Sequence, residues 1–104
     1  MDDDTVTMAV LEGMSPDGRY IFNNLLPEWE EMFAKKQQDY GDDANKLGIK
    51  GAFVDFHRKE GKIKRAIWDD QELVGEQPRE ILMDVVGHCF LMIAELDRLE
   101  GRRE

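Results

Sequence analysis

The sequence predicts an all-α (mainly α) domain built as a three-helix bundle, and three observations lead to that prediction. Of the 104 residues, 41% are hydrophobic and 36% are charged, a mixture typical of soluble proteins rich in amphipathic helix. Apolar residues recur at helical spacing in three segments, and Pro27 and Pro78 stand where helices can begin. Because a chain of this length buries only a modest core, we expect dimerisation to complete the bundle.

The N-terminal residues 1–24 form an acidic arm for which the pattern leaves two structures open. Ser15-Pro16-Asp17-Gly18 suits a tight turn between the β-leaning residues 5–11 and a return strand at 19–22. These segments would make a short β-hairpin, and an irregular arm fits the same residues. The predicted organisation is therefore an arm at 1–24, a single helical domain at 25–100 and a frayed tail at 101–104.

The first helix is expected to begin at Pro27 and to end near Gly41. Its apolar face is formed by Leu25, Trp29, Met32, Phe33 and Tyr40. Lys36 falls in the middle of that face, where it either extends to solvent along the edge of the core or enters a site. Residues 41–51 have loop chemistry, and the last four, 48–51, lead into the next helix with backbone amides and a lysine that suit an anion.

The second helix is expected from Ala52 to Trp68. An apolar line runs along one side of it, with Glu60 inside the line, and comprises Phe53, Phe56, Ile63 and Ile67. The opposite side is mostly basic and carries Asp55, Arg58, Lys62 and Arg65. An anionic ligand would be attracted to this basic side.

The third helix is expected from Arg79 to Leu99, after a polar connection. Its broad apolar face comprises Val85, Val86, Cys89, Phe90, Ile93 and Leu96. Four ionisable residues gather on another side of the helical wheel, namely Glu80, Asp84, His88 and Glu95. A charge in so apolar a helix must be paired, bound to a metal or neutralised, because burying it alone would cost several kcal/mol.

In a bundle, the charged residues on the inner faces of the three helices would converge. Inward carboxylates are how helical bundles build metal sites, so we expect Mg²⁺ to be held by Glu60, Glu80 and Asp84. These acids would also be the catalytic groups, and phosphates would meet Lys36, Lys62 and Arg65. His88 could orient Asp84 or act as a base. The alternatives are a hydrogen-bonded core histidine at 88 and a salt bridge from Asp84 to Lys36, Lys62 or Arg65.

Charge and motif content exclude several classes of function. The net charge of −9 argues against direct nucleic-acid binding and against an anionic membrane surface. No segment is apolar enough to span a bilayer, and the acidic start is unlike a signal peptide, so we expect a cytoplasmic protein. The single cysteine, Cys89, cannot form an internal disulfide. Zinc-site spacings, a P-loop and a serine-nucleophile motif are absent from the sequence.

One motif resembles a known family. Lys36-Gln37-Gln38-Asp39-Tyr40-Gly41 is similar to the Lys-x-x-Asp-Tyr-Gly signature of the first family of nucleotide-modification-associated domains, small helical proteins common in phages. The similarity continues through 47–51 and the basic helix 58–65 to Leu82-Met83-Asp84-Val85-Val86-Gly87-His88. The resemblance implies a phage protein acting in the bacterial cytoplasm, with Asp39 and Tyr40 joining Lys36 in nucleotide binding.

The motif Glu80-x-x-x-Asp84 and the apolar helix that follows it resemble, more loosely, the all-α nucleoside triphosphate pyrophosphatases of the MazG and dimeric dUTPase type. That resemblance implies a MazG-like hydrolase with Mg²⁺ as cofactor, although Ile81 stands where those enzymes place a glutamate. Two hypotheses therefore compete. One is a homodimeric nucleotide-binding protein with pyrophosphohydrolase or nucleotide-modification activity, and the other is a noncatalytic protein that sequesters a nucleotide signal or binds a host protein.

Overall fold

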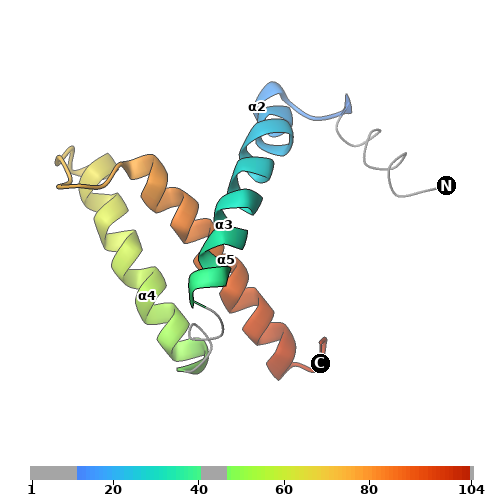
Figure 1. Cartoon of the computed structure of the whole chain (residues 1–104). Coiled ribbons are helices and arrows are strands. Elements are labelled where there is room, and N and C mark those ends of the chain that lie inside the picture. The colour runs from blue at the N-terminus through green and yellow to red at the C-terminus, as the bar shows by residue number, and fades with distance from the viewer. Residues whose placement is uncertain (1–11, 41–46, 104) are drawn as a thin grey trace. The chain divides into compact units, whose positions relative to one another are not determined.

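The computed structural model describes residues 12–40 and 47–103, and in these ranges it is all α, without a strand. Three long helical segments follow one another along the chain (Figure 1). The prediction of an all-α chain with three helices is confirmed. By contacts between residues the chain divides into two units, Met1–Gln38 and Asp39–Glu104, and each is described separately. No helix in the described ranges has the length and apolar character needed to cross a membrane.

The first helical segment begins well before Pro27. Helix α2 spans Pro16–Tyr20 and continues without a break through the π-helix η1 (Ile21–Leu25) into α3 (Leu26–Tyr40), as Figure 1 shows. The end of α3 agrees with the predicted end near residue 41. The widened turn of η1 lies directly before Pro27, and such a turn accommodates a proline, which lacks an N–H and crowds the preceding turn.

The predicted turn and return strand at 15–22 are wrong, and the hairpin with them. Ser15 is instead the N-cap of α2, where its Oγ accepts a hydrogen bond of 3.2 Å from the Gly18 N–H. Pro16 occupies the first turn and Asp17 lies near the positive helix end. Serine, proline and aspartate serve both turns and helix starts, so the four residues alone could not decide between them. Residues 5–11, the other predicted strand, lie outside the described residues.

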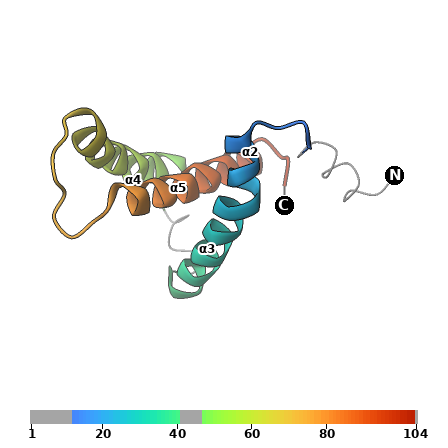
Figure 2. The same ribbon diagram turned by 90° about the horizontal axis from the view of Figure 1, so that it is seen from above.

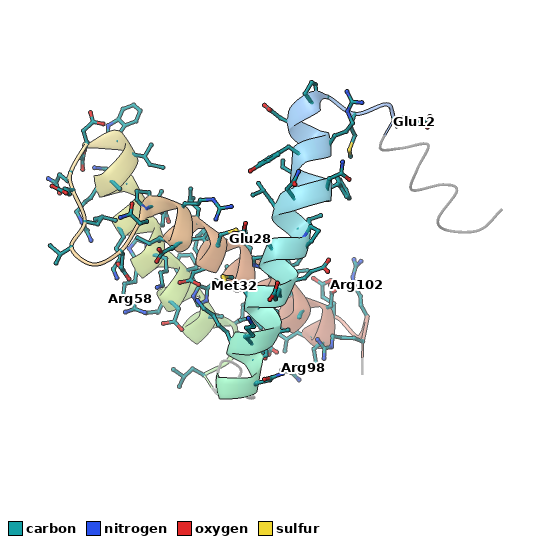
Figure 3. The ribbon with its side chains drawn as sticks, turned by 45° about the horizontal axis from the view of Figure 1, so that its top comes forward. Glu12, Glu28, Met32, Arg58, Arg98 and Arg102 are labelled. Carbon is teal, nitrogen blue, oxygen red and sulfur yellow. The ribbon has the colours of Figure 1, made fainter. Side chains whose placement is uncertain are left out.

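In the first unit, one side of α3 gathers its apolar residues around two aromatic rings. Trp29 and Phe33 stack with ring centroids 4.8 Å apart and planes 16° apart. Lys36 is half-buried on the same side, as its position in the apolar line predicted. Glu28 and Met32 of this helix are labelled in Figure 3.

Helix α4 spans Gly48–Ile63 and continues into the π-helix η3 (Lys64–Trp68). It therefore begins four residues before the predicted start at Ala52, and residues 48–51 are its first turn instead of a loop. Two glycines permit this start. Gly48 has a φ of +70°, and a Cβ on Gly51 would clash with the Leu47 Cβ, so neither position readily takes another residue. The predicted loop at 41–46 lies outside the described residues.

Helix α5 spans Pro78–Leu99 and matches the predicted third helix within one residue. It ends in a Schellman motif: Gly101 has a φ of +78°, its N–H bonds the Arg98 carbonyl at 3.2 Å, and the Arg102 N–H bonds the Asp97 carbonyl at 2.7 Å. Backbone hydrogen bonds therefore continue as far as Arg102, within the segment 101–104 that was predicted as a frayed tail. Figure 3 labels Arg98 and Arg102 at this end.

In the second unit, α4 and α5 pack side by side and are joined by residues 69–77 (Figures 1 and 2). Burial marks the side of α4 that contributes to the packing, which consists of Ile49, Ala52, Phe56, Lys59, Ile63 and Ala66, all half-buried and spaced alternately by three and four residues. Phe56 and Ile63 of the predicted inner line lie on this side, whereas its other two residues do not. Phe53 and Ile67 of that line are 54% and 57% exposed. This packing side contains two small alanines and a lysine, so the spacing of large apolar residues alone does not predict it.

Helix α5 places Ile81, Asp84, His88, Leu91 and Glu95 on its buried side, and we call these residues the inner row. Ile81 is 1% exposed and Glu95 is 8% exposed, whereas the other three are half-buried. The predicted apolar face lies largely outward, since Phe90, Ile93 and Leu96 are 48%, 51% and 44% exposed. The helix therefore buries its more polar side.

The burial of Ile81 generates the first prediction. Replacing Ile81 with alanine should lower the free energy of unfolding by about 2–5 kcal/mol, because it leaves a cavity at a fully packed position. The matched control is Val54→Ala in α4, where the side chain is 64% exposed and the loss should stay below about 1 kcal/mol. Urea denaturation followed by circular dichroism measures both, and equal losses would contradict the assigned packing.

Candidate functional site

The candidate site is a group of four charged side chains between α4 and α5, which we call the charge ladder. Lys59 Nζ of α4 lies 3.5 Å from Asp84 Oδ2 of α5. One turn further along α4, Lys62 Nζ lies 3.0 Å from Glu76 Oε2. Glu76 belongs to the connection between the two helices, shortly before α5 begins. The ladder thus ties both helices and their connection together.

The four side chains of the charge ladder are shielded to different degrees. Lys59 and Asp84 are 14% and 22% exposed, whereas Lys62 and Glu76 are 27% and 37% exposed. The Lys59–Asp84 pair, which we call the inner pair, therefore interacts through a less polar environment than the outer pair, Lys62–Glu76. The attraction between the two charges of the inner pair is correspondingly stronger, and removing either charge leaves the other poorly solvated. The outer pair lies closer to solvent, where its contribution to stability is smaller.

The electrostatics of the ladder are coupled. The hydrogen bond from Lys62 is the main cause that holds the pKa of Glu76 below its ordinary value of 4.5, and the charges of Lys62 and Lys59 act in the same direction. Partial burial and the negative charge of Asp84 oppose this lowering of the pKa. Because the Asp84 charge acts on Glu76, the two ion pairs form one network.

Asp84 was predicted to need a partner, and the structure supplies one that the sequence did not suggest. Lys59 is a partner of Asp84 that was not among the predicted cations, and the predicted salt bridge from Asp84 to Lys36, Lys62 or Arg65 stays a prediction. The signal that could have identified Lys59 is the alternating spacing that places it between Phe56 and Ile63 on the packing side. Glu76 has no such signal, because it lies outside any helix.

The other predicted acids lie apart from this ladder. The Glu60 carboxylate lies 3.9 Å from His57 Nδ1 on the same helix, and its side chain is 61% exposed. Glu80 is exposed at the start of α5. Among the residues that the structure describes, no three His, Cys, Asp or Glu side chains form a group that could hold a metal ion. The Mg²⁺ site at Glu60, Glu80 and Asp84 stays a prediction.

Most bases of the segment 57–65 have an acidic neighbour. Besides the two ladder lysines, Arg58 lies 3.9 Å from Asp55, and Lys64 lies 3.1 Å from Asp69. The basic side that was expected to attract an anion is therefore largely neutralised by the chain's own acids. Arg65, one of the predicted phosphate ligands, is exposed in η3.

The remaining predicted site residues divide between the two units. His88 is half-buried in the inner row, one turn after Asp84. Lys36 belongs to the first unit. Asp39 and Tyr40 are the last two residues of α3, and their side chains lie outside the described residues. The nucleotide-binding roles of Lys36, Asp39 and Tyr40 stay predictions.

A second acid of the inner row is also neutralised. Glu95 is bonded by Arg98 one turn later, with Nε 3.0 Å from Oε2 and an additional bond to Oε1. This bidentate hydrogen bond is the main cause that lowers the pKa of Glu95, and the charges of Arg98 and Arg103 add to it. Both shielded carboxylates of α5 therefore lie beside a cation of the same unit.

Comparison with models of protein families, with curated proteins and with solved structures finds no match to this chain.

The role of Asp84 can be tested by removing its charge. Asp84→Asn should lower the free energy of unfolding by about 1–3 kcal/mol, because it leaves the Lys59 ammonium half-buried without its counter-ion. The matched control is Glu80→Gln, one turn earlier and exposed, for which we expect a change within about 0.5 kcal/mol. A metal-binding acid would behave in the opposite way, since removing it relieves repulsion. A stabilised Asp84→Asn variant would contradict the ion pair.

The lowered pKa of Glu76 gives a pH-dependent prediction. Its folded-state pKa lies below 4.5, so the Lys62–Glu76 pair stabilises the fold fully above that pH and the contribution is lost as pH falls through the folded-state pKa. A carboxyl ¹³C NMR titration should find the Glu76 midpoint below 4.5 and should find it raised in Lys62→Met. A midpoint that Lys62→Met leaves unchanged would show that the lysine does not cause the shift.

Proposed function

We propose that this chain is a noncatalytic binding protein, the second of the two hypotheses drawn from the sequence. The observation that carries the proposal is the orientation of α5, which directs its charged inner row toward the packed interior and leaves several large apolar residues exposed, among them Phe90, Ile93 and Leu96. Exposed apolar side chains at helical spacing are typical of contact surfaces for another protein. The carboxylates of the inner row form ion pairs within the chain, so their burial is explained without a bound substrate.

The contacts of Asp84 support the same proposal. An acid that holds Mg²⁺ needs an open side, because the ion must reach the oxygen together with its waters. Lys59 Nζ lies 3.5 Å from Asp84 Oδ2, where it supplies the positive charge that a metal ion would otherwise supply. Glu60, the second acid of the predicted metal set, extends into solvent from α4. Binding without hydrolysis fits this arrangement better than metal-dependent chemistry.

The proposal predicts that the chain does not hydrolyse nucleotides. Incubation with a panel of ribo- and deoxyribonucleoside triphosphates and Mg²⁺ should release no more pyrophosphate or phosphate than a protein-free blank. Glu80→Gln serves as the matched variant, since it removes a predicted catalytic acid from an exposed position. Mg²⁺-dependent release that disappears in Glu80→Gln would contradict the proposal.

A second candidate function is binding of a nucleotide phosphate, and the location of Glu76 favours it. Glu76 lies in the connection instead of a helix, so it can move away and free Lys62 without disturbing α4 or α5. Lys62 and Arg65 lie about one helical turn apart and could then meet a phosphate chain.

A thermal-shift screen decides whether this candidate holds. Any ligand that prefers the native state raises its apparent stability, so nucleotides at millimolar concentration should raise the melting temperature with or without Mg²⁺. Lys62→Met should remove that rise, and Lys35→Met, which removes an exposed lysine of α3, should preserve it. The absence of any shift at millimolar nucleotide would eliminate this function and would leave protein binding as the proposal.

A further inference from the structure

The side of α4 opposite its packing side carries a line of apolar and basic residues, which we call the outer line. It consists of Leu47, Lys50, Val54, Arg58, Gly61 and Arg65. These positions are three or four residues apart, so they follow one side of the helix and continue into η3. Leu47 and Val54 are 80% and 64% exposed. The outer line therefore presents apolar side chains to solvent between positive charges.

All the ionisable side chains of the outer line are cations, although the whole chain has a net charge of −9. Arg58, which Figure 3 labels, lies 3.9 Å from Asp55, and both side chains are more than half exposed, so this pair is weak. Lys50 and Arg65 form no ion pair with any residue that the structure describes. The outer line is thus a positive surface on an acidic protein, and its complement is an acidic partner.

Gly61 indicates how closely such a partner can approach. Glycine is the least favourable helix residue after proline, yet Gly61 lies in the interior of α4. A Cβ added to Gly61 would meet Arg65 Nη1 at 3.7 Å and no other neighbouring side chain of the described ranges, so packing within the chain does not require a glycine. A second helix that crosses here would require one, because a missing side chain lets two backbones come close together.

We propose that the outer line is a docking site for an acidic amphipathic helix of another protein. Apolar side chains of that helix would cover Leu47 and Val54, and its backbone would pass over Gly61. Its carboxylates would meet Lys50 and Arg65. The line is about 27 Å long, which a partner helix of about 18 residues matches. The inference rests on the proposed binding function and names the chemistry of the partner.

Other partners are less complementary to the outer line. A second copy that presented its own outer line would bring cations against cations, and like charges in contact are unfavourable. A nucleic acid would find only a few cations on a protein with a net charge of −9, and its phosphates would leave Leu47 and Val54 uncovered. An acidic helix with one apolar side satisfies both the charges and the apolar residues.

A designed peptide tests the docking site on the full chain. The probe is a helical peptide of about 18 residues with leucines at heptad spacing and glutamates beside them, and its matched control has lysines in place of the glutamates. The glutamate peptide should bind and should shift the amide NMR signals of residues 47–65. Its affinity should fall as sodium chloride is added, because salt screens charges at an exposed surface. The lysine peptide should not bind.

Substitutions in the outer line sharpen the test. Lys50→Glu and Arg65→Glu should each weaken binding of the glutamate peptide about tenfold or more, whereas Lys35→Glu, at an exposed position of α3, should leave it unchanged. Gly61→Leu should weaken binding to a similar degree while its melting temperature stays equal or rises, since leucine favours a helix more than glycine does. A glycine with only a structural role would not show this combination.

Several results would overturn the docking site. One is a glutamate peptide that does not bind at millimolar concentration, and another is a lysine peptide that binds equally well. Signals that shift on α5 instead of α4, affinity that Lys50→Glu and Arg65→Glu leave unchanged, or tighter binding of a DNA duplex than of the glutamate peptide would also contradict it. None of these measurements depends on nucleotide hydrolysis, so failure of the docking site is distinguishable from failure of the noncatalytic proposal.

Discussion

The ion pair between Lys59 and Asp84 determines which side of α5 faces α4, and the rest of the second unit depends on that choice. Ile81 lies about one turn before Asp84 on the same side and is the most fully buried apolar side chain among the described residues. Turning α5 by half a turn would expose Ile81 and would leave the Lys59 ammonium facing apolar side chains. The pair thus fixes the orientation of the helix, even though a shielded salt bridge need not add much net stability.

A consequence of that orientation is the separation of polar and apolar surfaces. Charged side chains occupy the inner row, where each shielded carboxylate has a lysine or an arginine beside it. The apolar residues that periodicity alone would assign to a core are partly exposed instead. This distribution is costly for an isolated helical hairpin and is explained if another surface covers the exposed apolar residues of α5. Structure and proposed function therefore have the same origin in the placement of Asp84.

Periodicity and helix-start residues were sufficient to predict three helices and the bounds of α5, because Pro78 and a long apolar repeat agree there. They failed where one residue type serves two structures, as at Ser15 and Pro16, or where a packing side contains alanine and lysine, as in α4. For the site, the sequence indicated that Asp84 needs a partner but did not indicate Lys59. Lys59 reaches it by tertiary packing, and Glu76 lies in a connection that has no periodic pattern.

We attribute the neutralisation of Asp84 to the Lys59 ammonium and not to a metal ion. Titration with Mn²⁺, followed by amide NMR signals of the wild-type chain, tests it most directly, since a bound paramagnetic ion broadens the signals of nearby residues. The ion pair predicts no selective, saturable broadening around Asp84 and Glu80 at ion concentrations that leave the other signals unaffected. Saturable broadening confined to these residues and Glu60 would show that the acids form a metal site, and it would contradict the account.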